Sequence, residues 1–100
     1  MLVTSVRDRV ADRFLGLDLS INDKAACRDF VLAMDRLMRD KSGYAVSSVD
    51  DFEVWYLGEF DEENGSFYQN VDSHVLMTGF QARRELESFY SVLDDDESEE

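Results

Sequence analysis

The chain is 100 residues long, 44% of them hydrophobic, and it carries a formal net charge of -13. This length and composition fit one globular domain. The single cysteine, Cys27, excludes an internal disulfide and a zinc site of the multi-cysteine kind. No apolar run approaches the roughly 20 residues that a membrane helix needs, so we expect a cytoplasmic protein without a membrane segment.

The negative charge is concentrated in the second half of the chain. Residues 1–41 contain eight basic and seven acidic residues, whereas residues 42–80 contain eight acidic residues and no Lys or Arg. Six more acids lie in residues 94–100. Nonspecific nucleic-acid binding depends on Lys and Arg that neutralise phosphates. Any contact with DNA is therefore expected in the N-terminal half.

The first 20 residues fit two patterns. In an extended chain, alternation places on one face Leu2, Thr4, Val6, Val10 and Phe14. The other face then carries Arg7, Arg9 and Arg13. Three of these apolar residues also recur at helical spacing, so an amphipathic helix fits nearly as well. A strand is favoured after Gly16 by the alternating residues Leu15, Leu17, Leu19 and Ile21.

The clearest predicted element is a helix over residues 23–39. Asn22 is a suitable N-cap, and Gly43 is expected to stop the helix. Asp35 and Arg39 are spaced to form an ion pair one turn apart. An apolar stripe at helical spacing, which we expect to pack on a sheet, consists of Ala26, Phe30, Ala33, Met34 and Leu37.

Period-two alternation predicts a strand over residues 52–60. Its expected core face carries Phe52, Val54, Tyr56 and Phe60. Asn64-Gly65 favours a tight hairpin turn, after which residues 66–71 return as the next strand. A further short strand is predicted over residues 74–77.

The last predicted element is a helix that begins with a capping box of Thr78 and Gln81. Its expected apolar face consists of Ala82, Leu86, Phe89 and Leu93. The like-charged residues 94–100 are expected to form a disordered acidic tail. A single domain therefore covers residues 1–93.

Trp55 and Leu57 lie among glutamates on the second face of the strand over residues 52–60. That face needs a cover, which is either the C-terminal helix or another protein chain, because an exposed Trp beside a Leu is a plausible interface anchor. The candidate partner-binding residues are Trp55, Leu57, Glu59, Asp61, Glu62 and Glu63. The candidate nucleic-acid-binding residues are Arg7, Arg9 and Arg13.

No catalytic residue, metal site or cofactor is expected. The acids before Gly65 lack the alternating ligands and the later glutamate of a calcium loop. Catalysis through Cys27 and His74 would depend on two lone residues with nothing to fix their geometry. Aromatic sheets bind single-stranded nucleic acid beside a basic groove, but residues 52–60 contain no basic residue.

The segments "DDFEVWYLGEFDEENGSF" and "VLMTGFQA" resemble the nonstructural protein of small single-stranded DNA bacteriophages, the microviruses of the gokushovirus branch. The family motif D-[FY]-E-[LV]-x-x-L-G-E-[FY]-D-x-x-x-G matches residues 51–65. Shorter likenesses cover "SVRD" at residues 5–8, "NDKA" at residues 22–25, and Thr78-Gly79. The chain lacks the prolines that this family often carries before its helix and before the motif.

This resemblance implies a protein that is made in an infected bacterium, lies outside the capsid and takes part in genome replication or packaging. No catalytic residue comes with it. The resemblance also favours strands over a helix for residues 2–20.

The sequence thus predicts an α+β fold: a small antiparallel β-sheet, one main helix packed on it and a short C-terminal helix, in the order strand, strand, helix, three strands, helix. The expected function is that of a non-enzymatic phage accessory protein in the host cytoplasm, acting through a phage or host replication or packaging factor. Single-stranded DNA and a second copy of the chain are further candidate partners. The alternative is an acidic protein that mimics phosphate and occupies a basic site on another protein.

Overall fold

The computed structural model describes the backbone of residues 1–40 and 48–98, with the side chains of residues 70, 71 and 93–98 left out. The elements follow the order β1 (Leu2–Asp8), β2 (Arg13–Ser20), α1 (Asp23–Arg39), the 3-10 helix η1 (Val49–Asp51), β3 (Phe52–Phe60), β4 (Phe67–Thr78) and α2 (Gly79–Ser98). The predicted α+β fold is confirmed, including the bounds of the main helix and of the strand over residues 52–60. Gly43, the predicted helix stop, lies outside the described residues.

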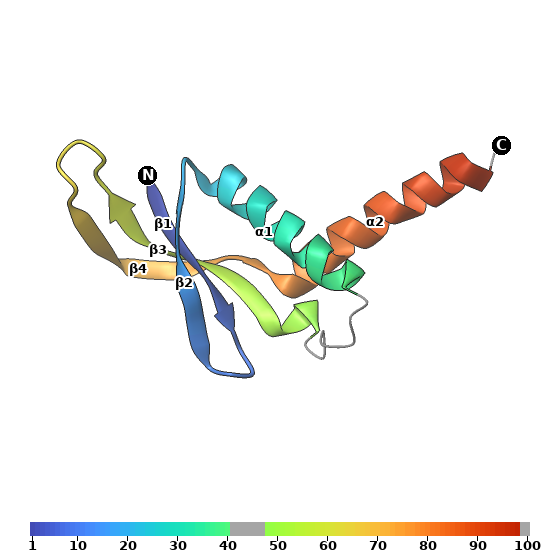
Figure 1. Ribbon diagram of the computed structural model, residues 1–100, viewed down its shortest axis with the longest axis horizontal. Coiled ribbons are helices and arrows are strands. Elements are labelled where there is room, and N and C mark those ends of the chain that lie inside the picture. The colour runs from blue at the N-terminus through green and yellow to red at the C-terminus, as the bar shows by residue number, and fades with distance from the viewer. Residues whose placement is uncertain (41–47, 99–100) are drawn as a thin grey trace.

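The four strands form one sheet in the order β2-β1-β3-β4, with every neighbouring pair antiparallel (Figure 1). β1 and β2 make a hairpin, so the first 20 residues are extended and not helical. In an antiparallel pair, directly opposite residues share a face and successive residues alternate between faces. The pairings of Val54 with Val6 and with Met77 therefore define one face of the sheet, and the pairings of Trp55 with Ser5 and with Val75 define the other.

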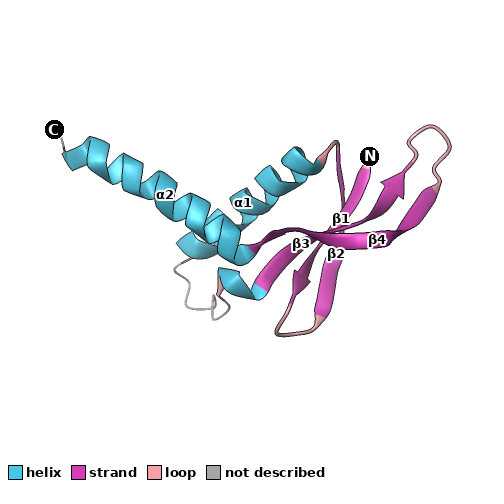
Figure 2. Ribbon diagram, turned by 180° about the vertical axis from the view of Figure 1, so that it is seen from behind, coloured by secondary structure: helices cyan, strands magenta, loops and turns pink. Residues whose placement is uncertain are grey.

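Both helices contribute to a core that includes Val54, so they pack on the Val54 face. α1 lies beside the strands, and α2 starts next to α1 and leads away from the sheet (Figures 1 and 2). The buried core joins residues from α1, α2, η1 and β3, namely Phe30, Met34, Val49, Val54, Ala82 and Leu86. The predicted stripe of the main helix is confirmed as its buried side. Burial of such side chains contributes about 1.5–3 kcal/mol each and is the main source of stability for a domain of this size.

Caps that the sequence predicts fix both helix starts. The Ala25 N–H donates to Asn22 Oδ1 (2.8 Å) at the start of α1. Thr78 and Gln81 form the predicted capping box, in which the Thr78 N–H donates to Gln81 Oε1 (2.9 Å) and the Gln81 N–H donates to Thr78 Oγ1 (3.1 Å). Arg39 also pairs with Asp35 (3.0 Å) as predicted.

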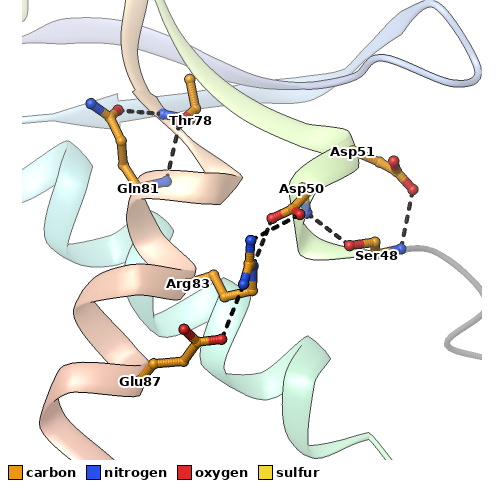
Figure 3. A network of polar contacts seen from close by, with 7 residues as sticks. All are labelled: Ser48, Asp50, Asp51, Thr78, Gln81, Arg83 and Glu87. Atoms are coloured by element: carbon orange, nitrogen blue, oxygen red, sulfur yellow. Dashed lines mark hydrogen bonds and ion pairs between the residues drawn. The ribbon is translucent and has the colours of Figure 1, made fainter.

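A polar network holds η1 against α2 (Figure 3). Arg83 donates from Nε and Nη2 to the two carboxylate oxygens of Asp50, at 2.9 and 3.2 Å, and from Nη1 to Glu87 (3.1 Å). These carboxylates raise the pKa of Arg83 above its ordinary value. Ser48 and Asp51 cap η1 reciprocally, since the Ser48 N–H donates to Asp51 Oδ2 (3.1 Å) and Ser48 Oγ accepts from the Asp50 N–H (3.2 Å). The network positions the start of β3 under the start of α2.

The second hairpin differs from the prediction in two respects. The two strands predicted over residues 66–71 and 74–77 are one strand, β4, although the register places Gly58 opposite Gln69 and Tyr56 opposite His74, so that residues 70–73 oppose Leu57 alone. Such bulges arise from pairing and leave no local signal. The turn is also longer than the predicted Asn-Gly turn: the Asp61 N–H donates to the Ser66 carbonyl, and the Asp61 carboxylate accepts from the Glu63 N–H (2.9 Å).

α2 is longer than predicted and continues to Ser98, so residues 94–98 of the expected disordered tail have a helical backbone. The chain from Phe80 to Ser98 contains neither Gly nor Pro to stop a helix that has already formed. α2 extends beyond the end of the sheet (Figure 1), which fits a radius of gyration of 15.8 Å against about 13 Å for a compact chain of this length. Phe89 is exposed, contrary to the prediction, and Tyr90 packs against the core in its place.

Candidate functional site

The Trp55 face of the sheet carries the candidate site, because neither helix packs on it. Of the two covers that the sequence left open for Trp55, the C-terminal helix is excluded, because Ala82 and Leu86 of α2 belong to the same core cluster as Val54, which lies on the other face. Trp55 is instead covered from within the sheet. Its ring meets Phe14 of β2 edge to face, with centroids 5.8 Å apart and ring planes at 83°.

Phe14 lies on this face because of the β1–β2 turn. The register places Phe14 opposite Arg7, so an odd-numbered residue of β1 faces an even-numbered residue of β2. A single alternation continued through the turn predicts that Phe14 lies with the core residues, and this prediction is wrong. Phe14 is 46% exposed. Hairpin length was the missing information, since it decides whether alternation continues in phase.

Arg7 joins the two aromatic rings to the carboxylates around them. Its guanidinium carbon lies 5.9 Å from the centre of the Phe14 ring, within the range of a cation–π contact. Arg7 pairs with Asp12, and its Nη1 lies 3.8 Å from Glu53 Oε1. Glu53 Oε1 also accepts a hydrogen bond from the Trp55 indole N–H (3.0 Å). The four side chains of Arg7, Phe14, Glu53 and Trp55 thus form one connected patch, which we call the aromatic–arginine patch.

The three predicted nucleic-acid-binding arginines do not share one face. Arg9 lies in the β1–β2 turn, where its backbone N–H donates to the Asp51 carbonyl (2.8 Å) and its side chain is exposed. Arg13 pairs with Asp8 in the register, one step from the Arg7–Phe14 pair, and so lies on the helix face at the sheet edge. Among the described residues, neither Arg9 nor Arg13 forms an ion pair.

The six predicted partner-binding residues are divided between two places. Trp55 belongs to the aromatic–arginine patch, and Leu57 is half-buried at the bulge of β3. Glu59 lies near the β3–β4 turn, and its carboxylate accepts a hydrogen bond from the Tyr56 hydroxyl (2.9 Å). The turn itself holds Asp61, Glu62 and Glu63, and in the described part of the chain no Lys or Arg pairs with any of these acids.

The β3–β4 turn with Asp61, Glu62 and Glu63, which we call the acidic turn, and the β1–β2 turn with Arg9 lie at opposite ends of β1 (Figure 1). The register pairs Leu2 with Glu59 at one end of β1 and Asp8 with Phe52 at the other. The acidic turn therefore lies apart from the arginines, which are beside Phe52. The arginine end also carries carboxylates, since Arg7 pairs with Asp12 and Glu53 and Asp8 lies opposite Arg13.

Cys27 and His74 are not brought together as a reactive pair. Cys27 lies on α1, with its Sγ 4.0 Å from the Leu76 carbonyl oxygen. His74 lies on β4, and its ring packs beside the ring of Tyr56 on β3. Burial, with the nearby charges of Asp23 and Glu85, raises the pKa of the Cys27 thiol. A raised pKa keeps this thiol protonated and poorly nucleophilic at neutral pH.

In residues 1–40, 48–69 and 72–92, whose side chains the structure describes, no three side chains of His, Cys, Asp or Glu gather closely enough to hold a metal ion. Neither of the helices described here is long and apolar enough to cross a membrane.

Comparison with known proteins gives one match. The family described as Phage ORF5 protein matches residues 1–82, which include the whole sheet, α1 and the first turn of α2. No curated protein and no solved structure matches the chain. The match includes every residue of the aromatic–arginine patch and of the acidic turn.

Proposed function

Because the chain belongs to the Phage ORF5 protein family, we propose that it is a non-enzymatic accessory protein of a small single-stranded DNA phage, a microvirus, that acts in replication or packaging of the viral genome. It works in the cytoplasm of the infected bacterium through a phage or host replication factor and through single-stranded DNA. The family membership supports a phage protein. The DNA contact rests on the aromatic–arginine patch.

The patch has the parts that single-strand binding needs. Bases of any sequence can stack on aromatic rings, and nearby arginines neutralise the backbone phosphates. Phe14 offers a half-exposed ring, Trp55 contacts this ring edge to face on the same side of the sheet, and Arg7 and Arg9 lie at the same end of the sheet. The acidic turn lies at the far end of β1 and does not compete for this place.

The DNA proposal predicts a specific loss of salt dependence. Replacing Arg7 and Arg9 together by Ala removes two phosphate contacts, so the slope of log affinity against log salt should fall by about 1.4 for a single strand. The measurement is fluorescence anisotropy of a labelled single-stranded oligonucleotide titrated with the protein across a salt series.

The matched control is Arg28→Ala with Arg36→Ala. Both of these arginines are exposed on α1, behind the sheet, so this variant loses the same charge from a different place. We expect the control to keep the wild-type slope. Equal slopes for the wild-type chain and the Arg7/Arg9 variant would contradict DNA binding at the patch.

The acidic turn favours a second candidate function, occupation of a basic site on another protein as a phosphate mimic. Glu59, Asp61, Glu62 and Glu63 meet at one hairpin end with no basic side chain paired to them in the described part of the chain. Charge complementarity of this kind accelerates association with a basic partner.

We expect Glu62→Gln with Glu63→Gln to weaken binding of a labelled oligo-arginine peptide several-fold at low salt, because these two exposed carboxylates lie at the turn itself. Asp29→Asn with Glu85→Gln removes the same charge from α1 and α2 and is the control. Equal losses in both variants, seen by anisotropy of the peptide, would mean that total charge and not the turn attracts the basic ligand.

A further inference from the structure

β2 is an outer strand of the sheet with a large apolar surface. Among the described strands it has a neighbour only on the β1 side, and seven of its eight residues are exposed. The exposed apolar side chains on and beside it are Val10, Phe14, Leu15, Leu17, Leu19 and Ile21. Natural edge strands are usually protected by charges, proline, a bulge or a covering segment. β2 carries two charged residues, Arg13 and Asp18, and one irregularity at Gly16, but no proline.

The positions of Arg13 and Asp18 allow two copies of β2 to pair with opposite charges facing each other. When β2 is paired antiparallel with an identical strand so that Arg13 lies opposite the partner's Asp18, the symmetry places Asp18 opposite the partner's Arg13. Both side chains lie on the helix face, because Arg13 pairs with Asp8 and Asp18 pairs with Thr4 in the same sheet. Neither residue has an ion pair among the described residues.

The same register also matches the apolar residues. Phe14 falls opposite the partner's Leu17, and both lie on the Trp55 face, because the irregularity opposite Ser5 shifts the alternation at Gly16. Leu15 falls opposite the partner's Gly16, which has no side chain to obstruct it. Val10 and Ile21, 77% and 75% exposed, lie just beyond the two ends of β2 and are brought toward each other across the pair.

The charge distribution favours dimer formation through β2 over dimer formation through β4, the other edge strand of the sheet. β4 also exposes Phe67 and Tyr68, but these residues follow the acidic turn, in a segment with eight acids and no Lys or Arg. Two copies that approached through β4 would bring like charges together. β2 lies in residues 1–41, whose eight basic and seven acidic residues nearly cancel, so a second copy is not repelled there.

We propose that the protein is a homodimer in which β2 pairs antiparallel with β2 of a second copy, giving one continuous eight-stranded sheet. The two aromatic–arginine patches then lie on the same face of this sheet, on either side of the two-fold axis. The proposal rests on the surface of β2 and does not depend on DNA binding.

The test uses charge reversal and sedimentation equilibrium of the full chain. Arg13→Asp places Asp opposite Asp in the dimer, and Asp18→Arg places Arg opposite Arg. Each variant alone should dimerise roughly tenfold or more weakly than the wild-type chain, since like charges directly opposite each other destabilise a strand pair. An equimolar mixture of the two variants should form a heterodimer with near wild-type affinity, because both of its pairs are again opposite in charge.

Recovery on mixing separates pairing from misfolding, since a misfolded chain does not regain its partner by mixing. The double variant Arg13→Asp/Asp18→Arg should also dimerise like the wild-type chain. Leu17→Lys tests the apolar part and should be monomeric where the wild-type chain is dimeric, whereas Leu32→Lys on the exposed side of α1 should remain a dimer. A monomeric wild-type chain, or single variants that dimerise normally and gain nothing on mixing, would overturn the proposal.

Discussion

Gly79→Ala is expected to destabilise the protein by about 3 kcal/mol, at the upper end of the range for inserting a methyl group into a closely packed place. A Cβ at Gly79 would overlap the Val49 carbonyl oxygen and press on the Phe52 carbonyl oxygen. Both are backbone atoms of the η1–β3 segment, which cannot move without disturbing the Asp50–Arg83 network. Thermal unfolding followed by circular dichroism should show a melting temperature lower by roughly 10–20 °C.

Gly58→Ala should be destabilising for a related reason, because its Cβ would overlap the Tyr68 carbonyl oxygen on β4. The control is Gly65→Asn. Gly65 has a φ of 74° with open space around it, and Asn tolerates this conformation. We expect Gly65→Asn to cost less than about 1 kcal/mol. Similar losses in all three glycine variants would show that close approach of the backbone is not what these positions require.

Phe30→Ala should have the largest effect of any single change, a loss of about 3–5 kcal/mol. Phe30 is buried at the centre of the cluster that joins α1 to η1, β3 and α2, so its removal leaves a cavity bordered by every layer of the fold. Urea unfolding should show a lower midpoint with an unchanged slope, because the folded and unfolded states remain otherwise the same.

Leu32→Ala is the matched control for Phe30→Ala. Leu32 lies on the same helix two residues away and is 50% exposed. Its truncation should change the free energy of unfolding by less than about 0.5 kcal/mol. A large loss in Leu32→Ala would indicate that the outer side of α1 is covered, and a small loss in Phe30→Ala would contradict the assignment of the core.

The sequence predicted the elements whose signals are local. The N-cap at Asn22, the capping box of Thr78 and Gln81, and the Asp35–Arg39 pair all depend on residues within one turn of each other, and all are confirmed. The strand over residues 52–60 is a long alternating run whose buried residue Val54 lies on the predicted face.

The sequence did not predict features that depend on pairing between distant segments. The face on which Phe14 lies follows from the register of β1 and β2, and the continuity of β4 follows from its pairing with β3. The length of α2 was missed because the acidic composition of residues 94–98 was taken as disorder, although neither Gly nor Pro ends the helix before them. The aromatic–arginine patch was not predicted as a unit, because it also depends on the register that places Phe14 on the Trp55 face.

The residues that carry the family resemblance have mostly structural roles. Asp51 caps η1, Asp61 organises the β3–β4 turn, Thr78 caps α2, and Gly58 and Gly79 permit close backbone approach. The motif leaves position 55 open and does not include Phe14. The motif thus specifies the fold, and it does not by itself predict the patch on which the DNA proposal rests.

The most direct test of the DNA proposal is a titration of the intrinsic fluorescence of Trp55 with a single-stranded oligonucleotide. Trp55 is the only tryptophan of the chain and lies inside the aromatic–arginine patch, so its emission reports on that place alone. We predict saturable quenching at low salt that is reversed as salt is raised, because stacking and phosphate contacts occur together. An unchanged Trp55 emission at oligonucleotide concentrations that saturate an anisotropy signal would place the DNA elsewhere, and the absence of any binding at low salt would contradict the proposed DNA-handling role.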